Sequence, residues 1–412
     1  MSTLLKSGYK QTEVGVIPED WCVKSVRQLG DPVRGGSPRP AGDPRFFNGA
    51  YMPWLTVAAL TNIPASQLMV KETATCLTEE GSLRSRTLLP GTLIIANSGA
   101  TLGVSKILGF KCCANDGIAA ILNISKDVSA EYLAHFINTK TIYLREVVAT
   151  GNGQPNLNTD LIGRFNIPLP PTKAEQEAIV EALTDADSLI DSLEQLVTKK
   201  RHLKQGAMRD LLSGNRRLPG FSQEWDVKRL GDVVAPRNER IDPRKNGVQE
   251  FCIELEHVGS STGELLGYTS TGENSSLKSV FRAGDVLFGK LRAYLRKYWW
   301  ADRAGVCSTE IWVLAPREHF ITSAYLFQIV QTDKFIELAS YSYGTHMPRS
   351  DWNVVKNYEL SIPHNPDEQT AIARALSDMD AEIAELEAQL TKARTIKQGM
   401  MSELLTGKIR LR

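Results

Sequence analysis

The sequence predicts an α+β protein: two similar α/β domains and two long antiparallel helices, arranged domain–helix–domain–helix. Two observations carry this prediction. The segment from Glu175 to Gly214 returns without a gap from Glu368 to Gly407, and many of its positions are identical. The stretch before each copy consists of short apolar runs broken by Gly, Asn and Pro, which is typical of strands. A long internal repeat of this kind indicates two units related by a pseudo-twofold axis.

Each copy of the repeat reads as one long helix with a coiled-coil seam. Its apolar residues recur in alternating steps of four and three, a period of 3.5 residues. In the first copy these residues are Ile179, Leu183, Ala186, Ile190, Leu193 and Val197, and in the second Ile372, Leu376, Met379, Ile383, Leu386 and Leu390. One such helix alone would leave its seam exposed, so we expect the two to pair antiparallel.

Capping residues mark where the helices begin. Thr172 and Glu175 form the pattern of a capping box. Asn365 can cap the second helix, with Pro366 at its first position. The glycine at the end of each repeat supplies a stop. The predicted boundaries are 1–171 for the first domain, 172–216 for the first helix, 217–364 for the second domain and 365–412 for the second helix.

The repeat extends from the helices into the domains. The offset of 193 positions that joins the two helices also joins Gly91 to Gly284, Ile118 to Ile311 and Gly151 to Gly344. Arg410 stands at the same offset from Arg217, where a third copy would begin. Glycines and strand positions match between the halves, whereas loop residues differ. This pattern indicates one scaffold that presents two different recognition surfaces.

Composition excludes several classes of protein. A chain of 412 residues is expected to hold two or three domains. The net charge of +1 supports no strong electrostatic claim on nucleic acid. The six cysteines lack metal-ligand spacing, and neither a secretory signal nor a long apolar run is seen. We therefore expect a cytoplasmic protein that holds no metal and has no membrane partner.

The sequence offers no catalytic residue. A Walker loop, a G-x-G-x-x-G turn and an H-E-x-x-H helix are all missing, as is the N-P-P-[YF] type of motif with which amino-methylating enzymes hold a flipped base. Glu254, Glu256 and His257 lie close together, but the last two would face opposite ways on a strand. We expect neither a nucleophile–base pair nor a bound cofactor.

Loops of the second domain carry side chains suited to DNA. The run from Phe288 to Trp300 interleaves basic and aromatic residues. Arginine and lysine can contact phosphates or guanine edges. The alternative is that the aromatic side chains are core and the charges are merely solvated. The candidates here are Lys290, Arg292, Tyr294 and Arg296.

The first domain offers a different set of candidates. The equivalent stretch, from Asn97 to Gly103, has hydrogen-bonding side chains and no charge, and Asn97 aligns with Lys290. A preceding loop has three arginines, of which Arg45 is the last, and could meet the DNA backbone. A Gly-containing loop precedes each helix. In the first domain this loop carries amide side chains suited to reading adenine, and in the second domain the corresponding loop carries two basic residues. The candidates are Arg34, Ser37, Arg39, Asn97, Ser98, Thr101, Gln154 and Asn156, with His346 and Arg349 as the counterparts of the last two.

The chain resembles the specificity (S) subunits of bacterial type I restriction–modification systems over nearly its whole length. The most specific pieces are the run F-R-A-G-D-V-L-F-G-K-L-R from Phe281 to Arg292, the C-S-T-E from Cys307, and the duplicated E-Q-x-A-I…K-Q-G…L-L-[ST]-G helices. The I-P-E-D-W from Ile17 also fits the family's opening. Ala293 departs from the proline that family members often carry there, which concerns loop geometry.

The resemblance implies a non-catalytic, DNA-recognition role. Each domain would be a target-recognition domain that reads half of a split, asymmetric site on double-stranded DNA. The helices would set the spacing and dock two methyltransferase (modification) subunits, and motor–nuclease (restriction) subunits would cut. S-adenosylmethionine, ATP and Mg would be bound by those partners only. Modules on one DNA face sit about 34 Å apart, and helices of roughly 55–60 Å at 1.5 Å per residue are long enough to enforce that separation.

Two other classes stay open at this stage. The chain could be a non-catalytic coiled-coil adaptor without sequence-specific DNA binding, which sequence-independent binding of the assembled complex would favour. It could also carry its own methyltransferase site, which the missing motifs argue against and methyl transfer by the single chain would revive.

Overall fold

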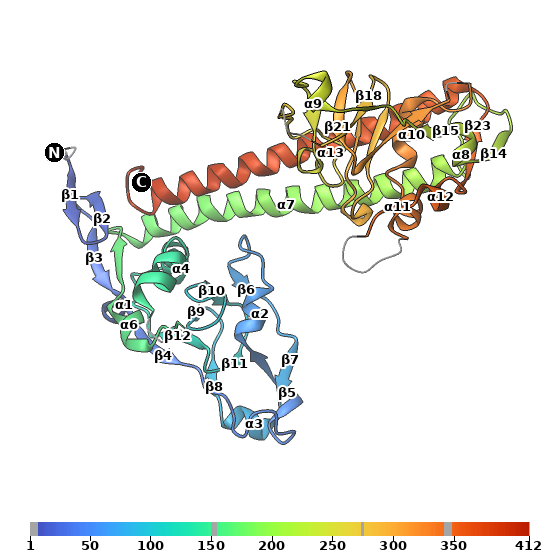
Figure 1. Cartoon of the computed structure of the whole chain (residues 1–412). Helices are drawn as coiled ribbons and strands as arrows, with labels where there is room; N and C mark the ends of the chain where they lie inside the picture. Colours follow the sequence, from blue (N-terminus) through green and yellow to red (C-terminus); the bar gives the residue numbers. More distant parts are fainter. Residues whose placement is uncertain (1–6, 150–154, 273–275, 318, 342–347, 412) are drawn as a thin grey trace. The chain divides into compact units, whose positions relative to one another are not determined.

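The computed structural model describes residues 7–149, 155–272, 276–317, 319–341 and 348–411. Internal contacts divide the chain into two compact units. Unit 1 comprises Met1–Gln195 with Glu387–Arg412, and unit 2 comprises Leu196–Leu386. Each unit holds one α/β domain together with half of each long helix (Figure 1). The predicted fold class, two similar α/β domains with two long helices, is confirmed.

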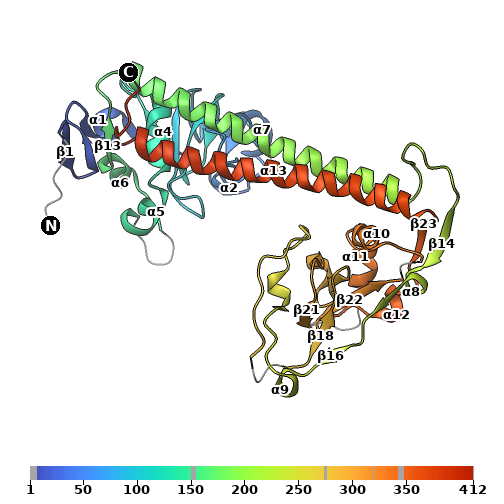
Figure 2. The same ribbon diagram turned by 90° about the horizontal axis from the view of Figure 1, so that it is seen from above.

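The two long helices are α7 (Lys173–Leu212) and α13 (Pro366–Leu404), of 40 and 39 residues. They run side by side within each unit (Figure 2). In unit 1, Arg394 pairs with Glu194 at 2.6 Å and Lys397 pairs with Asp187. In unit 2, Lys200 pairs with Glu382 at 2.5 Å. The residue numbers of the paired side chains rise along α7 as they fall along α13, so the two helices pair antiparallel, as expected.

Eight of the twelve predicted seam residues are buried, and Ala186, Leu193, Met379 and Leu386 are half-buried. Ile179, Leu183, Ile372 and Leu376 are fully buried. Ile190, Val197, Ile383 and Leu390 are also buried, whereas Leu189, one position off the seam, is exposed. Burying such side chains contributes about 1.5–3 kcal/mol each, so the seam is a main source of helix stability.

The helix starts agree with the predicted caps in part. Thr172 Oγ1 accepts a hydrogen bond from Glu175 N at 3.3 Å, and Asn365 Oδ1 accepts one from Asp367 N at 2.8 Å. The return bond of a capping box from the Glu175 side chain does not form. Its carboxylate instead accepts from the Arg410 guanidinium, because a charge-assisted bond is stronger than one to a neutral amide.

The first domain contains two main sheets. The larger has the strand order β4-β12-β9-β10-β6, and the smaller has the order β7-β5-β11-β8. Pairs β1-β2 and β13-β3 lie apart from them. The strands are β1 (Tyr9–Thr12), β2 (Gly15–Pro18), β3 (Cys22–Ser25), β4 (Asp31–Arg34), β5 (Phe47–Leu55), β6 (Met69–Val70), β7 (Thr75–Leu77), β8 (Arg86–Leu88), β9 (Leu93–Ala96), β10 (Ser105–Leu108), β11 (Cys112–Ala114), β12 (Ile118–Leu122) and β13 (Asn166–Leu169). The helices are α1 (Val26–Leu29), α2 (Val57–Thr61), α3 (Glu79–Leu83), α4 (Ala130–Asn138), α5 (Thr141–Tyr143), the π-helix η1 (Leu144–Val148) and α6 (Thr159–Arg164).

The second domain repeats this plan. Its sheets have the orders β15-β22-β19-β20 and β16-β18-β21-β17, with the pair β14-β23. The strands are β14 (Trp225–Arg229), β15 (Val234–Pro236), β16 (Arg240–Ile241), β17 (Cys252–Ile253), β18 (Lys278–Phe281), β19 (Val286–Gly289), β20 (Tyr298–Trp300), β21 (Gly305–Ser308), β22 (Ile311–Pro316) and β23 (Glu359–Pro363). The helices are α8 (Leu230–Val233), α9 (Pro243–Asn246), η2 (Leu255–His257), η3 (Ala293–Leu295), α10 (Ser323–Ile329), α11 (Asp333–Ser340) and α12 (Trp352–Val355).

Strand register confirms that the repeat continues into the domains. Ile118 of β12 lies opposite Ala96 of β9, and Ile311 of β22 lies opposite Gly289 of β19. Both members of each pair differ by the same 193 positions as the helices. In each domain the central strand therefore leads into an equivalent loop, which is where the candidate residues stand.

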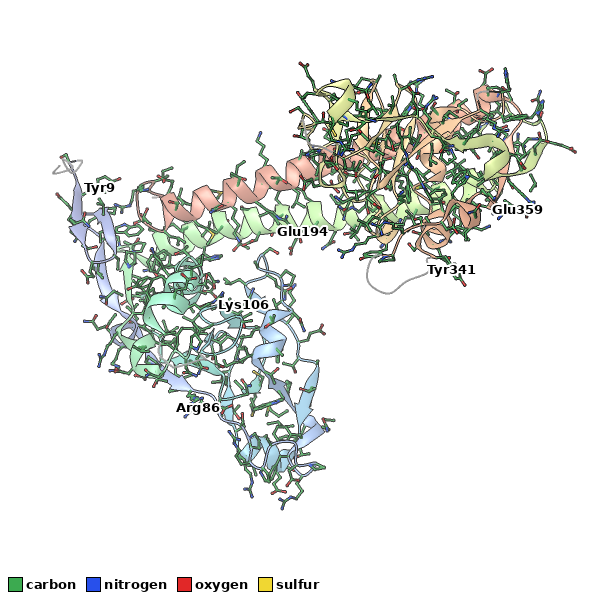
Figure 3. All side chains as sticks on the ribbon, in the orientation of Figure 1. Tyr9, Arg86, Lys106, Glu194, Tyr341 and Glu359 are labelled. Atoms are coloured by element: carbon green, nitrogen blue, oxygen red, sulfur yellow. The ribbon has the colours of Figure 1, made fainter. Side chains whose placement is uncertain are left out.

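Each domain packs against the helices through one short helix. In unit 1, α4 lies between the sheet and α7 (Figures 1 and 2), and its Tyr132 and Leu133 share a core with Ile179 and Leu183. Lys106 of β10 lies on the same side of the domain (Figure 3). It is only 2% exposed, and its Nζ donates to the carbonyls of Pro64 and Gln67. Burial lowers the pKa of Lys106 to about 8.

Candidate nucleic-acid interface

The first domain gathers several candidate residues around one carboxylate, that of Asp116. Ser37 Oγ donates to Asp116 Oδ1 at 2.7 Å. Arg39 Nη2 lies 3.5 Å from Asp116 Oδ2. Arg34 Nε donates to the Asp116 carbonyl at 2.6 Å, and its Nη2 lies 4.0 Å from Asp116 Oδ2. The loop between β11 and β12 thus collects side chains from the end of β4 and from the segment after it.

Asn97 belongs to the same cluster but lies in the interior. Only 2% of the residue is exposed, and its Nδ2 donates to the Asp116 carbonyl at 3.2 Å. Its Oδ1 is buried and has no hydrogen-bond partner among the described residues. The sequence predicted Asn97 as a DNA-contacting residue, whereas in this structure its amide is buried and hydrogen-bonds to the backbone of the loop between β11 and β12. The reason is its position directly after β9, whose residues are all buried.

The remaining candidates of the first domain border this cluster. Ser98 pairs with Asn156 in an isolated antiparallel bridge. Thr101 Oγ1 lies 3.5 Å from Thr61 Oγ1. Gln154 lies outside the described residues. The bridge brings the two amide-bearing loops together although they are far apart in sequence.

The second domain builds the same frame with different side chains. Leu291 and Arg349, the positions aligned with Ser98 and Asn156, also form an isolated bridge. Lys290 N donates to the Glu310 carbonyl at 2.9 Å, just as Asn97 N donates to that of Gly117 at 3.0 Å. His346 lies outside the described residues. The backbone is therefore shared, and the chemistry displayed on it is not.

Two of the basic candidates in the second domain have side chains without a partner among the described residues. Within the described part of the chain, neither Lys290 nor Arg292 has a hydrogen bond or an ion pair from its side chain. Arg292 is exposed and adopts the left-handed conformation, with φ 55°. Such strain costs on the order of 1–3 kcal/mol and gathers at functional sites. These two cations are the ones best placed to meet an anionic ligand.

The other two basic candidates are held by carboxylates. Arg296, also left-handed with φ 52°, pairs with Asp333 at the start of α11. Arg349 Nε donates to Glu310 Oε2 at 2.8 Å, and this bond raises the pKa of Arg349. Between Arg292 and Arg296, the η3 turn leaves Tyr294 56% exposed. Tyr294 is thus a surface residue, whereas Tyr298 and Trp299 are core, as the alternative interpretation of the aromatic residues held.

Sequence reasoning missed three residues at this surface. Asp116 and Glu310 were not candidates, because carboxylates are unexpected where DNA is to bind. Arg86 was missed as well. It is the exposed first residue of β8 (Figure 3), and its Nε donates to the Arg34 carbonyl at 2.8 Å. No sequence signal links Arg86 to Arg34, since the two residues lie in different sheets and meet only in the folded domain.

The acidic group with His257 has a structural role. Glu254 accepts from Lys278 Nζ at 2.6 Å, and Glu254 N donates to His257 Nδ1 at 3.1 Å. Over the described residues, no group of His, Cys, Asp and Glu side chains could hold a metal ion. In the same part of the chain, no helix is both long and apolar enough to cross a bilayer.

A sequence profile described as "Type I restriction modification DNA specificity domain" matches residues 18–201 and again residues 222–393. The chain belongs to this family. The two matches correspond to the two halves of the repeat, so each domain with its following helix is one copy of the family's unit. The resemblance found in the sequence is confirmed.

Individual relatives agree with this assignment. The MjaVIII specificity subunit of Methanocaldococcus jannaschii is 22% identical over 96% of this chain and 94% of its own length. The MjaIX specificity subunit of the same organism is 29% identical over 58% of this chain and 57% of its own length. The type I S subunit from M. genitalium has a similar fold, with a TM-score of 0.58, 12% identity and coverage of 98% of both chains. The chain is therefore a specificity subunit of a type I restriction–modification system.

Proposed function

We propose that the chain reads a bipartite, asymmetric site on double-stranded DNA, with each domain reading one half-site. The observation that carries this proposal is the pair of matching frames. The bridge Ser98–Asn156 recurs as Leu291–Arg349. The side chains at these aligned positions differ: a hydroxyl and an amide in the first domain, an apolar group and a guanidinium in the second. Two surfaces of like geometry and unlike chemistry suit two different base sequences.

The proposal gives the two domains different modes of contact. In the second domain, Lys290 and Arg292, which have no side-chain partner among the described residues, offer cations for phosphates or guanine edges. In the first, Arg34 and Arg39 are exposed but tied to Asp116, and Ser98 and Asn156 are uncharged. We expect binding by the second domain to depend more steeply on salt than binding by the first, since counterion release follows free cations.

The helices α7 and α13 are proposed to set the spacing between half-sites and to dock two methyltransferase subunits, with motor–nuclease subunits joining the same complex. In the proposed assignment this chain itself has no catalytic role. S-adenosylmethionine, ATP and Mg would belong to the partner subunits.

The first experiment maps methylated adenines across the host genome with and without this gene. We expect one split motif to lose methylation in the deletion. If no motif changes although the chain co-purifies with a methyltransferase, sequence reading by this chain is refuted.

A second experiment tests the role of the helices in spacing. Adding one turn to both α7 and α13 should lengthen the gap between the half-sites and leave the half-sites themselves unchanged. A methylated motif with its original gap would refute that role. The matched control inserts the same number of residues into the loop that follows Gly214 and leaves both helices at their original length. This variant should leave the gap between the half-sites unchanged.

A further inference from the structure

Asp116 places a carboxylate in the middle of a surface proposed to bind an anionic polymer. Its side chain is 40% exposed, and those of Arg34 and Arg39 are 55% and 73% exposed. All three can therefore meet a ligand. Phosphate groups repel a carboxylate, so its presence lowers affinity for DNA of any sequence. A residue that weakens binding in general suits a site where discrimination matters more than affinity.

The loop that carries Asp116 is held rigidly. Gly36 N donates to the Ala114 carbonyl at 2.9 Å. A Cβ at Gly35 would lie 2.1 Å from the Asn115 carbonyl oxygen, and one at Gly117 would lie 2.5 Å from Val57 Cγ2. The backbone on both sides of Asp116 is thus packed as closely as glycine allows. Side chains tied to its carboxylate inherit that fixed position.

Ser37 fixes the carboxylate itself. Its hydroxyl donates to Asp116 Oδ1 at 2.7 Å and accepts from Asp116 N at 3.3 Å. With one oxygen occupied by Ser37, the other, Oδ2, is the one that lies near Arg39 and Arg34. The carboxylate therefore holds the Arg39 guanidinium from one side at 3.5 Å, whereas the Arg34 guanidinium lies 4.0 Å from it and is held mainly by the Asp116 backbone carbonyl.

We propose that Asp116 is a positioning residue for sequence discrimination at the half-site read by the first domain, a role that rests on the proposed function. A free arginine beside DNA moves to the nearest phosphate, a contact that carries no sequence information. Arg34 and Arg39 are restrained from that move by Asp116. Their N–H groups stay aimed at one place, where bidentate donors can read base edges.

The second domain contains a comparable pair. Glu310 accepts from Arg349 Nε at 2.8 Å, and its side chain is 27% exposed. Glu310 aligns with Gly117, the residue next to Asp116. The acid thus stands at nearly the same place in both domains, and each acid restrains an arginine at the candidate surface. Glu310→Gln is therefore the reciprocal variant for the other half-site.

The experiment measures DNA binding by the complete complex with its methyltransferase subunits. The duplexes contain the mapped motif, the motif with one or the other half-site scrambled, or neither half-site. Each is titrated over a range of salt concentrations. Asp116→Asn should tighten binding to the duplex with neither half-site and steepen the slope of log K against log salt by about 0.9 for each arginine released to a phosphate.

Discrimination provides the decisive readout. Asp116→Asn should lower the preference for one intact half-site by roughly tenfold, the effect expected from loss of an oriented bidentate contact. The preference for the other half-site should stay unchanged, and Glu310→Gln should show the opposite selectivity. Asp116→Glu keeps the charge and should keep the salt slope of the unsubstituted chain.

The matched control is Glu80→Gln. It removes the same charge from the same domain and releases Arg84, which pairs with Glu80 at 3.4 Å. It should leave discrimination at both half-sites unchanged. If Asp116→Asn does not fold, Ser37→Ala replaces it, since that variant removes both hydrogen bonds between Ser37 and Asp116 and no charge. Ser37→Ala should lower discrimination without changing the salt slope.

The results separate this proposal from the one on which it rests. If the unsubstituted complex shows no preference for any motif, the proposed function fails. If it discriminates while Asp116→Asn and Ser37→Ala both retain full discrimination, the role of Asp116 is overturned. Equal losses at both half-sites, or the same loss in Glu80→Gln, would overturn it as well.

Discussion

The strongest stability prediction concerns the two arginines that anchor the helix starts. In unit 1, the Arg410 guanidinium contacts Glu175 and Asp20 and lies 5.7 Å from the Trp21 ring centroid. In unit 2, Arg217 contacts Glu368 at 2.6 Å and lies 5.4 Å from the Trp225 ring centroid. The two sites are equivalent in the repeat, so each serves as the control for the other.

Arg410→Ala should destabilise unit 1 by about 3 kcal/mol. The side chain of Glu175 is only 5% exposed, and breaking a buried pair by removal of one partner costs about 3–5 kcal/mol. The contact with Asp20, whose side chain is 49% exposed, adds little. Arg217→Ala should cost less, about 2 kcal/mol, because Glu368 would keep the hydrogen bond from Trp225 Nε1 at 3.3 Å.

Native-state hydrogen exchange of the full chain, followed by mass spectrometry, measures each unit separately. Arg410→Ala should accelerate exchange at the start of α7 by roughly 100-fold, since each 1.4 kcal/mol corresponds to a factor of ten. Peptides of unit 2 should not change. A larger effect from Arg217→Ala than from Arg410→Ala would refute the argument that the second donor to Glu368 matters. No effect from either would refute the contribution of the buried pairs.

Three further predictions follow from single side chains. Burial lowers the pKa of His135 from 6.5 to about 4, with Lys397 and Lys106 adding to the shift. The unfolded chain therefore binds the proton first as pH falls, so the free energy of unfolding should decline from pH 6.5 to 4 by up to about 3 kcal/mol. His135→Gln introduces the residue found at the aligned position 328. This variant should flatten the decline in acid titrations followed by circular dichroism. Lys290→Ala or Arg292→Ala should weaken binding at one half-site only, the one that Asp116→Asn leaves intact, by roughly 5- to 100-fold in binding titrations; equal weakening at both would contradict the assignment. Leu183→Ala, at a fully buried seam position, should cost about 2–5 kcal/mol in urea unfolding, whereas Leu189→Ala, at a position 55% exposed, should change stability by less than about 0.5 kcal/mol.

The sequence predicted those features that depend on periodicity or on the repeat. The seam of α7 and α13, the caps at Thr172 and Asn365 and the matching frames of the two domains all follow from spacing alone. The contacts of Asp116 could not be predicted in this way. Asp116 and Arg34 lie 82 positions apart, and only the pairing of β4 with β12 brings them together. The burial of Asn97 was missed for a related reason, since Asn97 directly follows the fully buried strand β9 and lies in the domain interior with it.

The way in which each domain is attached to the helices explains how the two surfaces can differ. Gln176 accepts from Ser129 N and donates to the carbonyls of Asp127 and Pro170. Gln369 repeats these contacts with Thr322 N and the carbonyls of Phe320 and Pro363. All of these partner atoms belong to the backbone, so these glutamine contacts place no demand on the identity of the domain residues that they hold.

Because every chain sequence offers the same backbone atoms, loop residues of a domain can change without loosening these glutamine contacts. The buried glutamines thus allow variation at the recognition surface while the helix contacts stay fixed. The same argument gives a limit. Gln176 is 1% exposed, and replacing it with leucine would leave two carbonyls and one N–H buried without partners, which costs about 1–3 kcal/mol for each group. The position therefore tolerates far less change than the loops that it supports.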